Sequence, residues 1–175
     1  MKLSKKELFS IPNCLSYLRL IMIPIFIYFY LTAHSLKDYY KAAIIIILSG
    51  ATDIADGYIA RRYGLITELG KLLDPIADKL TQAAIFICLL YRYWSLWPLA
   101  LLFFVKELSM AVSGIVLLRR GKKLSGAMWF GKLSTLVFYF CMLILLAFPT
   151  LPQGIRNIIM LIVAMFLLLA FILYS

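Results

Sequence analysis

Residues 53–61 read Asp-Ile-Ala-Asp-Gly-Tyr-Ile-Ala-Arg, and eight residues later positions 70–78 read Gly-Lys-Leu-Leu-Asp-Pro-Ile-Ala-Asp. These two runs are mostly apolar, yet they contain half of the eight acidic residues of the chain. Ionisable side chains within apolar helices are costly to bury without partners, and they usually mark a functional site. The stretch therefore predicts a site built from four carboxylates: Asp53, Asp56, Asp74 and Asp78.

The composition around this stretch is that of an integral membrane protein. Of the 175 residues, 64% are hydrophobic, whereas soluble domains average roughly 45–50%. Six apolar segments approach or reach the roughly 20 residues that a helix needs to cross a bilayer: 14–33, 41–60, 72–91, 97–118, 133–149 and 155–174. We therefore expect an all-α, multi-pass fold with six transmembrane helices in a single domain over residues 1–175.

The charge distribution predicts the orientation of these helices. The net charge is +10, but the Lys and Arg residues gather at alternate connections, as in membrane proteins whose basic loops face the cytoplasm. Both termini and the aspartates are then cytoplasmic, and the basic rim favours anionic lipids rather than nucleic acid. Residues 2–10 mix Lys with Leu and Phe, which predicts a short amphipathic helix on the membrane surface.

Helical spacing brings the carboxylates together. Residues three or four apart share one face of a helix, so Asp53 and Asp56 lie together, as do Asp74 and Asp78. The connection between the two helices centres near residue 65 or 66. In an antiparallel pair Asp53 then lies at the depth of Asp78, and Gly57 at the depth of Asp74. All four carboxylates are predicted to converge on one pocket near the cytoplasmic surface.

Four neighbouring carboxylates repel one another unless cations compensate them. Two divalent cations would supply the missing charge, and all-oxygen ligands suit Mg²⁺ or Mn²⁺. The absence of Cys and His from the two runs argues against zinc. Pairs of such ions serve phosphoryl chemistry, so the sequence predicts a phosphate ester substrate, with a lipid tail because the site lies within the membrane zone.

Small residues and one arginine share this helix face. Gly57, Ala60 and Gly70 leave room for a ligand to approach the backbone, although small residues also promote close helix packing in membranes. Arg61 lies one turn beyond Asp56 at the membrane surface. It is placed either to hold a phosphate or to anchor the helix at the cytoplasmic surface.

The two runs together resemble the signature of the CDP-alcohol phosphatidyltransferase family. The matching residues are Asp53-x2-Asp56-Gly57-x2-Ala60-Arg61-x8-Gly70-x3-Asp74-x3-Asp78. The resemblance implies transfer of a phosphatidyl group from CDP-diacylglycerol to an alcohol, with release of CMP. It implies that the four aspartates hold the metals and that Asp78 also acts as the general base. Residues implied to line the CDP pocket are Asn13, Asp56, Gly57, Ala60, Arg61 and Gly70.

The acceptor alcohol depends on residues outside this string. The opening Ile11-Pro12-Asn13-Cys14-Leu15-Ser16-x2-Arg19 resembles that of bacterial members that use glycerol 3-phosphate. This resemblance implies the bacterial inner membrane and a homodimer. Candidates for the acceptor phosphate are Arg19, Lys106, Arg120 and Lys132.

Lys106 is a charge within an apolar segment with Glu107 beside it, so it either lines a cavity or takes part in a structural Lys–Glu pair between helices. The family members that use glycerol 3-phosphate typically have Arg-Glu there. Lysine is a point charge where arginine offers a planar fork, so this departure leaves the acceptor open.

Two alternatives compete with this assignment. The first is a cardiolipin synthase of the same family, which uses phosphatidylglycerol as acceptor; inositol phosphate, serine and amino alcohols are weaker choices. The second belongs to another class, a divalent-cation transporter whose carboxylates line an ion path. A transporter does not explain the Gly and Arg residues at fixed offsets from the aspartates.

Overall fold

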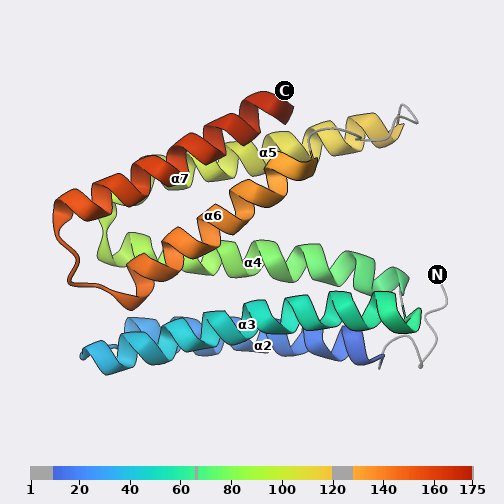
Figure 1. Ribbon diagram of the computed structural model, residues 1–175, viewed down its shortest axis with the longest axis horizontal. Helices are drawn as coiled ribbons and strands as arrows, with labels where there is room; N and C mark the ends of the chain where they lie inside the picture. The colour runs from blue at the N-terminus through green and yellow to red at the C-terminus, as the bar shows by residue number, and fades with distance from the viewer. Residues whose placement is uncertain (1–9, 66, 120–127, 175) are drawn as a thin grey trace. The chain divides into compact units, whose positions relative to one another are not determined.

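The chain is all-α in its computed structural model, which describes residues 10–65, 67–119 and 128–174. Within these ranges the structure contains helices and no strand. The elements in order are α2 (Ile11–Leu31), α3 (Leu36–Tyr63), α4 (Glu68–Arg92), the 3₁₀ turn η1 (Trp94–Leu96), α5 (Trp97–Arg119), α6 (Met128–Ala147) and α7 (Gln153–Tyr174) (Figure 1).

Each long helix coincides with one of the six apolar segments of the sequence. Three helical stretches are long and apolar enough to cross a membrane: Ile11–Leu31, Leu36–Tyr63 and Gln153–Ile172. A shorter apolar stretch covers Leu133–Ala147. The all-α prediction is therefore confirmed, whereas the count of six spans stays a prediction. The amphipathic helix predicted at 2–10 lies almost wholly outside the described residues.

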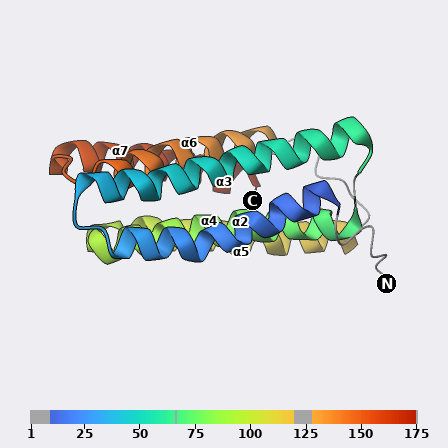
Figure 2. The ribbon, with the colours of Figure 1, turned by 90° about the horizontal axis from the view of Figure 1, so that it is seen from below.

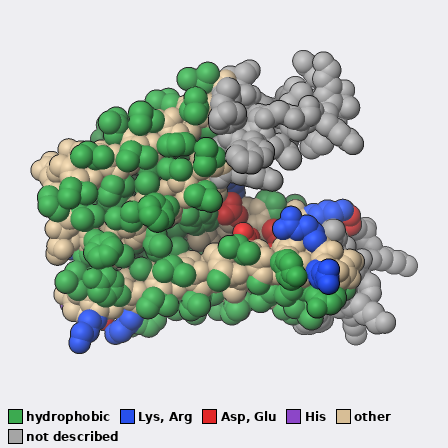
Figure 3. Space-filling model, viewed as in Figure 1, with side chains coloured by type: hydrophobic (Ala, Val, Ile, Leu, Met, Phe, Trp, Pro, Cys, Tyr) green, Lys and Arg blue, Asp and Glu red, His purple; other side chains and the backbone are tan. Residues whose placement is uncertain are grey.

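The exterior of the helices agrees with a lipid environment. On the face drawn in Figure 3, hydrophobic side chains cover most of the described surface. Large apolar side chains on every long helix are exposed, such as Tyr28, Ile54, Leu108 and Ile172, each more than 60% accessible. Contiguous apolar exterior of this extent is typical of helices that face lipid.

The chain divides into two compact units, Met1–Cys88 and Leu89–Ser175. In the first unit α2 and α3 form an antiparallel hairpin (Figures 1 and 2). Local sequence explains its ends. The Ser35 backbone N–H donates to Asp38 Oδ2 at 3.2 Å, a helix-capping contact at the start of α3. Gly64 ends α3 with φ of 65°, a left-handed conformation that glycine adopts without strain.

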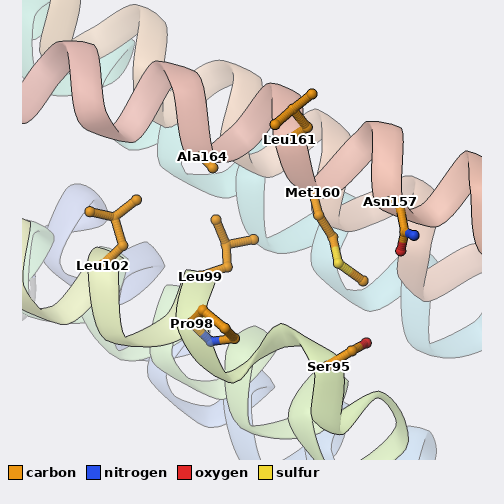
Figure 4. Close-up of a pocket in the computed structure, with 8 residues that line it drawn as sticks. All are labelled: Ser95, Pro98, Leu99, Leu102, Asn157, Met160, Leu161 and Ala164. Atoms are coloured by element: carbon orange, nitrogen blue, oxygen red, sulfur yellow. The ribbon is translucent and has the colours of Figure 1, made fainter.

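In the second unit α7 packs on both α5 and α6. Phe103 of α5 stacks on Phe138 of α6 with 5.4 Å between ring centroids, and the Tyr93 hydroxyl donates to the Pro149 carbonyl at 2.8 Å. An apolar pocket of about 330 Å³ lies between α5 and α7 (Figure 4). Its eight lining residues include none of the residues predicted for the site.

Candidate active site

The four signature aspartates belong to the first unit and lie on two consecutive helices. Asp53 and Asp56 are on α3, and Asp74 and Asp78 are on α4. The connection spans residues 64–67, where the sequence places it. Asp53 interacts electrostatically with Asp74 and Asp78, and Asp56 interacts with Asp53 and Asp74. The carboxylates therefore form one electrostatic cluster.

A third helix, α2, supplies the positive charge of this cluster. Arg19 is only 2% exposed, and its Nη1 lies 2.5 Å from Asp53 Oδ1. Its Nη2 donates to Asp56 Oδ2. Asp56 is buried as well, whereas the side chain of Asp53 is 51% exposed. Arg19 thus bridges two carboxylates one helical turn apart, and its predicted role at an acceptor phosphate stays a prediction.

The carboxylates of α4 have neutral partners. The Ser16 hydroxyl of α2 donates to Asp74 Oδ1 at 2.6 Å. Gln82 Nε2 donates to Asp78 Oδ2 at 3.3 Å, one turn along α4. Hydrogen bonds to ionised groups are stronger than neutral ones, so these contacts fix the orientation of both carboxylates.

Asn13 and Gly70 form a close contact between α2 and the start of α4. The Thr67 hydroxyl donates to Asn13 Oδ1 at 3.0 Å and accepts from the Gly70 N–H at 2.9 Å. A Cβ built on Gly70 would lie 2.8 Å from Asn13 Oδ1. The absence of a side chain at Gly70 therefore permits the approach of α2, a structural reason for this glycine beside the predicted role in CDP binding.

Gly57, Ala60 and Arg61 lie along the last two turns of α3. Arg61 is exposed, and its Nε donates to the Gly57 carbonyl at 2.9 Å. A Cβ on Gly57 would meet only Arg61 Nη2, at 3.5 Å. The arginine therefore rests on its own helix beside the small residue, where it remains accessible to a phosphate.

The other candidates for the acceptor phosphate belong to the second unit. Lys106 is buried, and its Nζ lies 2.8 Å from Glu107 Oε1 and 5.9 Å from the centre of the Phe103 ring. The two side chains pair within α5, and not between helices as the sequence leaves open. Arg120 lies outside the described residues, and Lys132 lies on α6 with a side chain that the structure does not describe.

The donor set suits a hard divalent cation, because every ionisable ligand in the cluster is a carboxylate. Among the described residues, no three His, Cys, Asp or Glu side chains are arranged closely enough to hold an ion. Arg19 contacts one oxygen of Asp53 and one of Asp56. A cation already bridges these two carboxylates, so the position itself accepts positive charge.

Ser16 is the residue of this site that the sequence did not single out, whereas Asn13 and Arg19 on the same face of α2 are candidates from the sequence. Pro12, Asn13, Ser16 and Arg19 recur at helical spacing and are all buried. Their signal was available, because buried polar side chains on an apolar helix usually face a functional interior. What the spacing alone does not reveal is which aspartate each of them contacts.

The fold and site together define a class: an all-α protein with helices long and apolar enough to cross a membrane, and a group of aspartates on two consecutive helices, two of them paired with an arginine. A sequence model of the CDP-alcohol phosphatidyltransferase family matches residues 9–170, which covers the helices of both units. The chain belongs to this family of transferases.

Several characterised relatives share part of the chain. A probable phosphatidylglycerophosphate synthase of Mycobacterium tuberculosis is 36% identical over 130 residues, 73% of this chain and 61% of that protein. A CDP-diacylglycerol–glycerol-3-phosphate 3-phosphatidyltransferase of Rickettsia typhi is 42% identical over 83 residues, 47% of this chain and 46% of the relative.

A fusion protein of Schizosaccharomyces pombe, named cardiolipin synthase (CMP-forming) / mitochondrial hydrolase, is 40% identical over 89 residues, 50% of this chain and 14% of that protein. The matched regions thus span 61% or less of the length of these three relatives.

Proposed function

We propose that this protein transfers the phosphatidyl group of CDP-diacylglycerol to glycerol 3-phosphate, giving phosphatidylglycerophosphate and CMP. The observation that carries the proposal is the cluster of Asp53, Asp56, Asp74 and Asp78 on α3 and α4, held from α2. Family membership and the names of the bacterial relatives support the choice of donor and acceptor.

The four aspartates would hold two Mg²⁺ or Mn²⁺ ions. When bound, such ions would neutralise the pyrophosphate and stabilise the charge of the departing CMP. The chain positions the ligands for this: Ser16 orients Asp74, and the α2–α3 hairpin presents Asp53 and Asp56 to the same space. Exposure of the Asp53 side chain gives a ligand access to the cluster.

Asp78 would act as the general base. The hydroxyl of the acceptor attacks the phosphorus that carries diacylglycerol, its proton passes to the Asp78 carboxylate, and the bond from this phosphorus to the oxygen of CMP breaks. Gln82 donates to one oxygen of Asp78 and orients this carboxylate for proton transfer. Arg61 and the small residues Gly57, Ala60 and Gly70 would line the CDP pocket with Asn13 and Asp56.

The arrangement in the membrane belongs to the same proposal. Six spans would place both termini and the aspartate cluster on the cytoplasmic side of a bacterial inner membrane, where a soluble phosphate acceptor meets a lipid donor. A homodimer in contact with membrane lipids is the expected assembly.

A second acceptor has a specific observation in its favour. The match to the fusion protein named cardiolipin synthase (CMP-forming) is about as strong in identity as the match to the bacterial glycerol-3-phosphate enzymes. Phosphatidylglycerol is therefore the alternative acceptor, with the same donor and the same aspartates.

The test is CMP release by the full chain purified in detergent micelles, with CDP-diacylglycerol, Mg²⁺ or Mn²⁺ and one acceptor at a time. We expect release with glycerol 3-phosphate and a product mass of phosphatidylglycerophosphate. An Asp56→Asn variant, which keeps the size of the side chain, is the matched control and should release none. Release with phosphatidylglycerol alone would replace the acceptor, and no release with any acceptor would contradict the function and favour cation transport.

A further inference from the structure

Arg19 places a buried positive charge where the family signature calls for a metal. It approaches the cluster from α2, 37 positions before Asp56 in the chain. Its guanidinium is bound to one oxygen of Asp53 and one of Asp56, the two carboxylates that α3 presents. A divalent cation held by the same two aspartates would compete with this guanidinium for their negative charge.

The contacts of Arg19 are incomplete for a permanent structural ion pair. A buried arginine usually satisfies its planar fork with two parallel hydrogen bonds to one carboxylate. Here the two terminal nitrogens reach different carboxylates. Nη1 pairs with Asp53 without hydrogen-bond geometry, and the buried Nε has no hydrogen-bond partner among the described residues. Unmet donors of this kind lower the free energy gained from burying the group.

The charge of the cluster leads to the same conclusion. One guanidinium supplies a single positive charge to Asp53 and Asp56, so this pair retains an excess of negative charge when both are ionised. A divalent ion supplies more charge within less space. Asp53, with its half-exposed side chain, offers the route by which such an ion would reach the oxygens that Arg19 holds.

We propose that Arg19 is an exchangeable internal cation, which holds Asp53 and Asp56 in the metal-free protein and releases them when a divalent cation binds. This inference rests on the proposed function for the presence of the metal. A released guanidinium within the protein requires a new anion, and a phosphate group of the bound nucleotide supplies it. Arg19 thereby couples metal binding to phosphate binding.

The experiment compares the wild-type protein with Arg19→Gln, both as full chains purified in micelles with Mn²⁺ and then dialysed. Mn²⁺ affinity is measured by calorimetry. Because Arg19 competes for the oxygens and repels the ion, Arg19→Gln should bind Mn²⁺ at least about tenfold more tightly than the wild type. CMP should strengthen Mn²⁺ binding in the wild type and do so less in the variant.

Thermal unfolding provides a reading that does not depend on activity. Without metal, Arg19→Gln leaves Asp53 and Asp56 uncompensated and should unfold at a lower temperature than the wild type. With saturating Mn²⁺ the two proteins should unfold at nearly the same temperature. Lys41→Gln is the control, because it removes a cation from an exposed ion pair with Asp38 and should lower stability equally in both conditions.

If Arg19→Gln can be purified only in the presence of Mn²⁺, a variant that retains the positive charge provides the comparison. Arg19→Lys has one ammonium group, which cannot bridge both carboxylates as a guanidinium does. It should bind Mn²⁺ more tightly than the wild type, by a smaller factor. Equal losses of stability with and without Mn²⁺, or unchanged or weaker Mn²⁺ binding in both variants, would overturn the exchange.

CMP release by the wild type on the same preparation separates the two proposals. Release together with unaltered Mn²⁺ affinity in the variants would reject the exchange and leave the function standing. Tighter Mn²⁺ binding in the variants without any release by the wild type would reject the function and support the exchange.

Discussion

Arg19 in the first unit and Lys106 in the second are both buried cations on apolar helices, and each is only 2% exposed. They differ in where their partners lie in the chain. Arg19 joins two aspartates of another helix, 34 and 37 positions away. Lys106 pairs with Glu107, its immediate neighbour on α5.

The comparison separates two uses of a buried charge. A pair of adjacent residues forms as soon as the helix forms and compensates itself locally. A pair between helices requires the hairpin and therefore depends on the tertiary structure, and its energy can be altered by whatever else binds the carboxylates. We infer that the charges of the first unit serve a ligand site, whereas the Lys106–Glu107 pair lowers the free-energy cost of burying a charge on α5.

The largest effect should come from the aspartate whose proposed role is in the chemistry itself. Asp78→Asn keeps the shape of the side chain and removes the base, so turnover should fall by about 10²- to 10⁴-fold. Binding of CDP-diacylglycerol, measured by calorimetry, should remain. Turnover like that of the wild type would remove the base assignment.

Breaking the pair of the second unit should affect stability. Lys106→Met leaves Glu107 without its cation, and the free energy of unfolding should fall by roughly 3 kcal/mol. The double variant Lys106→Met with Glu107→Gln should recover most of this loss in thermal unfolding, with or without Mn²⁺. If the double variant is no more stable than Lys106→Met, or if the stability of either variant depends on Mn²⁺, the Lys106 pair would not differ in kind from the contacts of Arg19.

Ser16 tests whether α2 orients the ligands of the first unit. Ser16→Ala removes the hydrogen bond to Asp74, and loss of an outer partner of a metal ligand typically costs 10- to 100-fold in metal affinity or activity. We expect about a tenfold loss of Mn²⁺ affinity by calorimetry. Thr81→Ala is the matched control, because the Thr81 hydroxyl bonds only to a carbonyl of its own helix, that of Ala77; an equal loss there would contradict the orienting role.

The smallest effect concerns the packing of α2 on α4. Gly70→Ala places a Cβ 2.8 Å from Asn13 Oδ1, so the free energy of unfolding should fall by about 1–2 kcal/mol in thermal unfolding. Gly50→Ala is the control, since a Cβ there meets nothing within 4 Å and should stabilise α3 slightly. Equal behaviour of the two variants would show that Asn13 does not restrict the position of Gly70.

Much of the site could be predicted because its aspartates share helix faces. The spacing of Asp53 and Asp56, and of Asp74 and Asp78, follows from the geometry of one helix, and the position of the connection at 64–67 sets their depths. The polar residues of α2 lie within an apolar helix, and its sequence does not show which other helix they face. Their partners could therefore not be assigned. The contact of Arg19 with the carboxylates is therefore not evident from the sequence, and its predicted role at an acceptor phosphate stays a prediction.

The sequence alone determined the helical composition, the apolar exterior and the aspartate signature, because each follows from local periodicity and residue type. Only the tertiary structure decided which charges meet. The approach of α2 to α3 and α4 requires Gly70 beside Asn13 and brings Arg19 to Asp53 and Asp56. Such contacts depend on packing between segments distant in the chain, and α2 stabilises the carboxylates through two of them: Arg19 on Asp53 and Asp56, and Ser16 on Asp74.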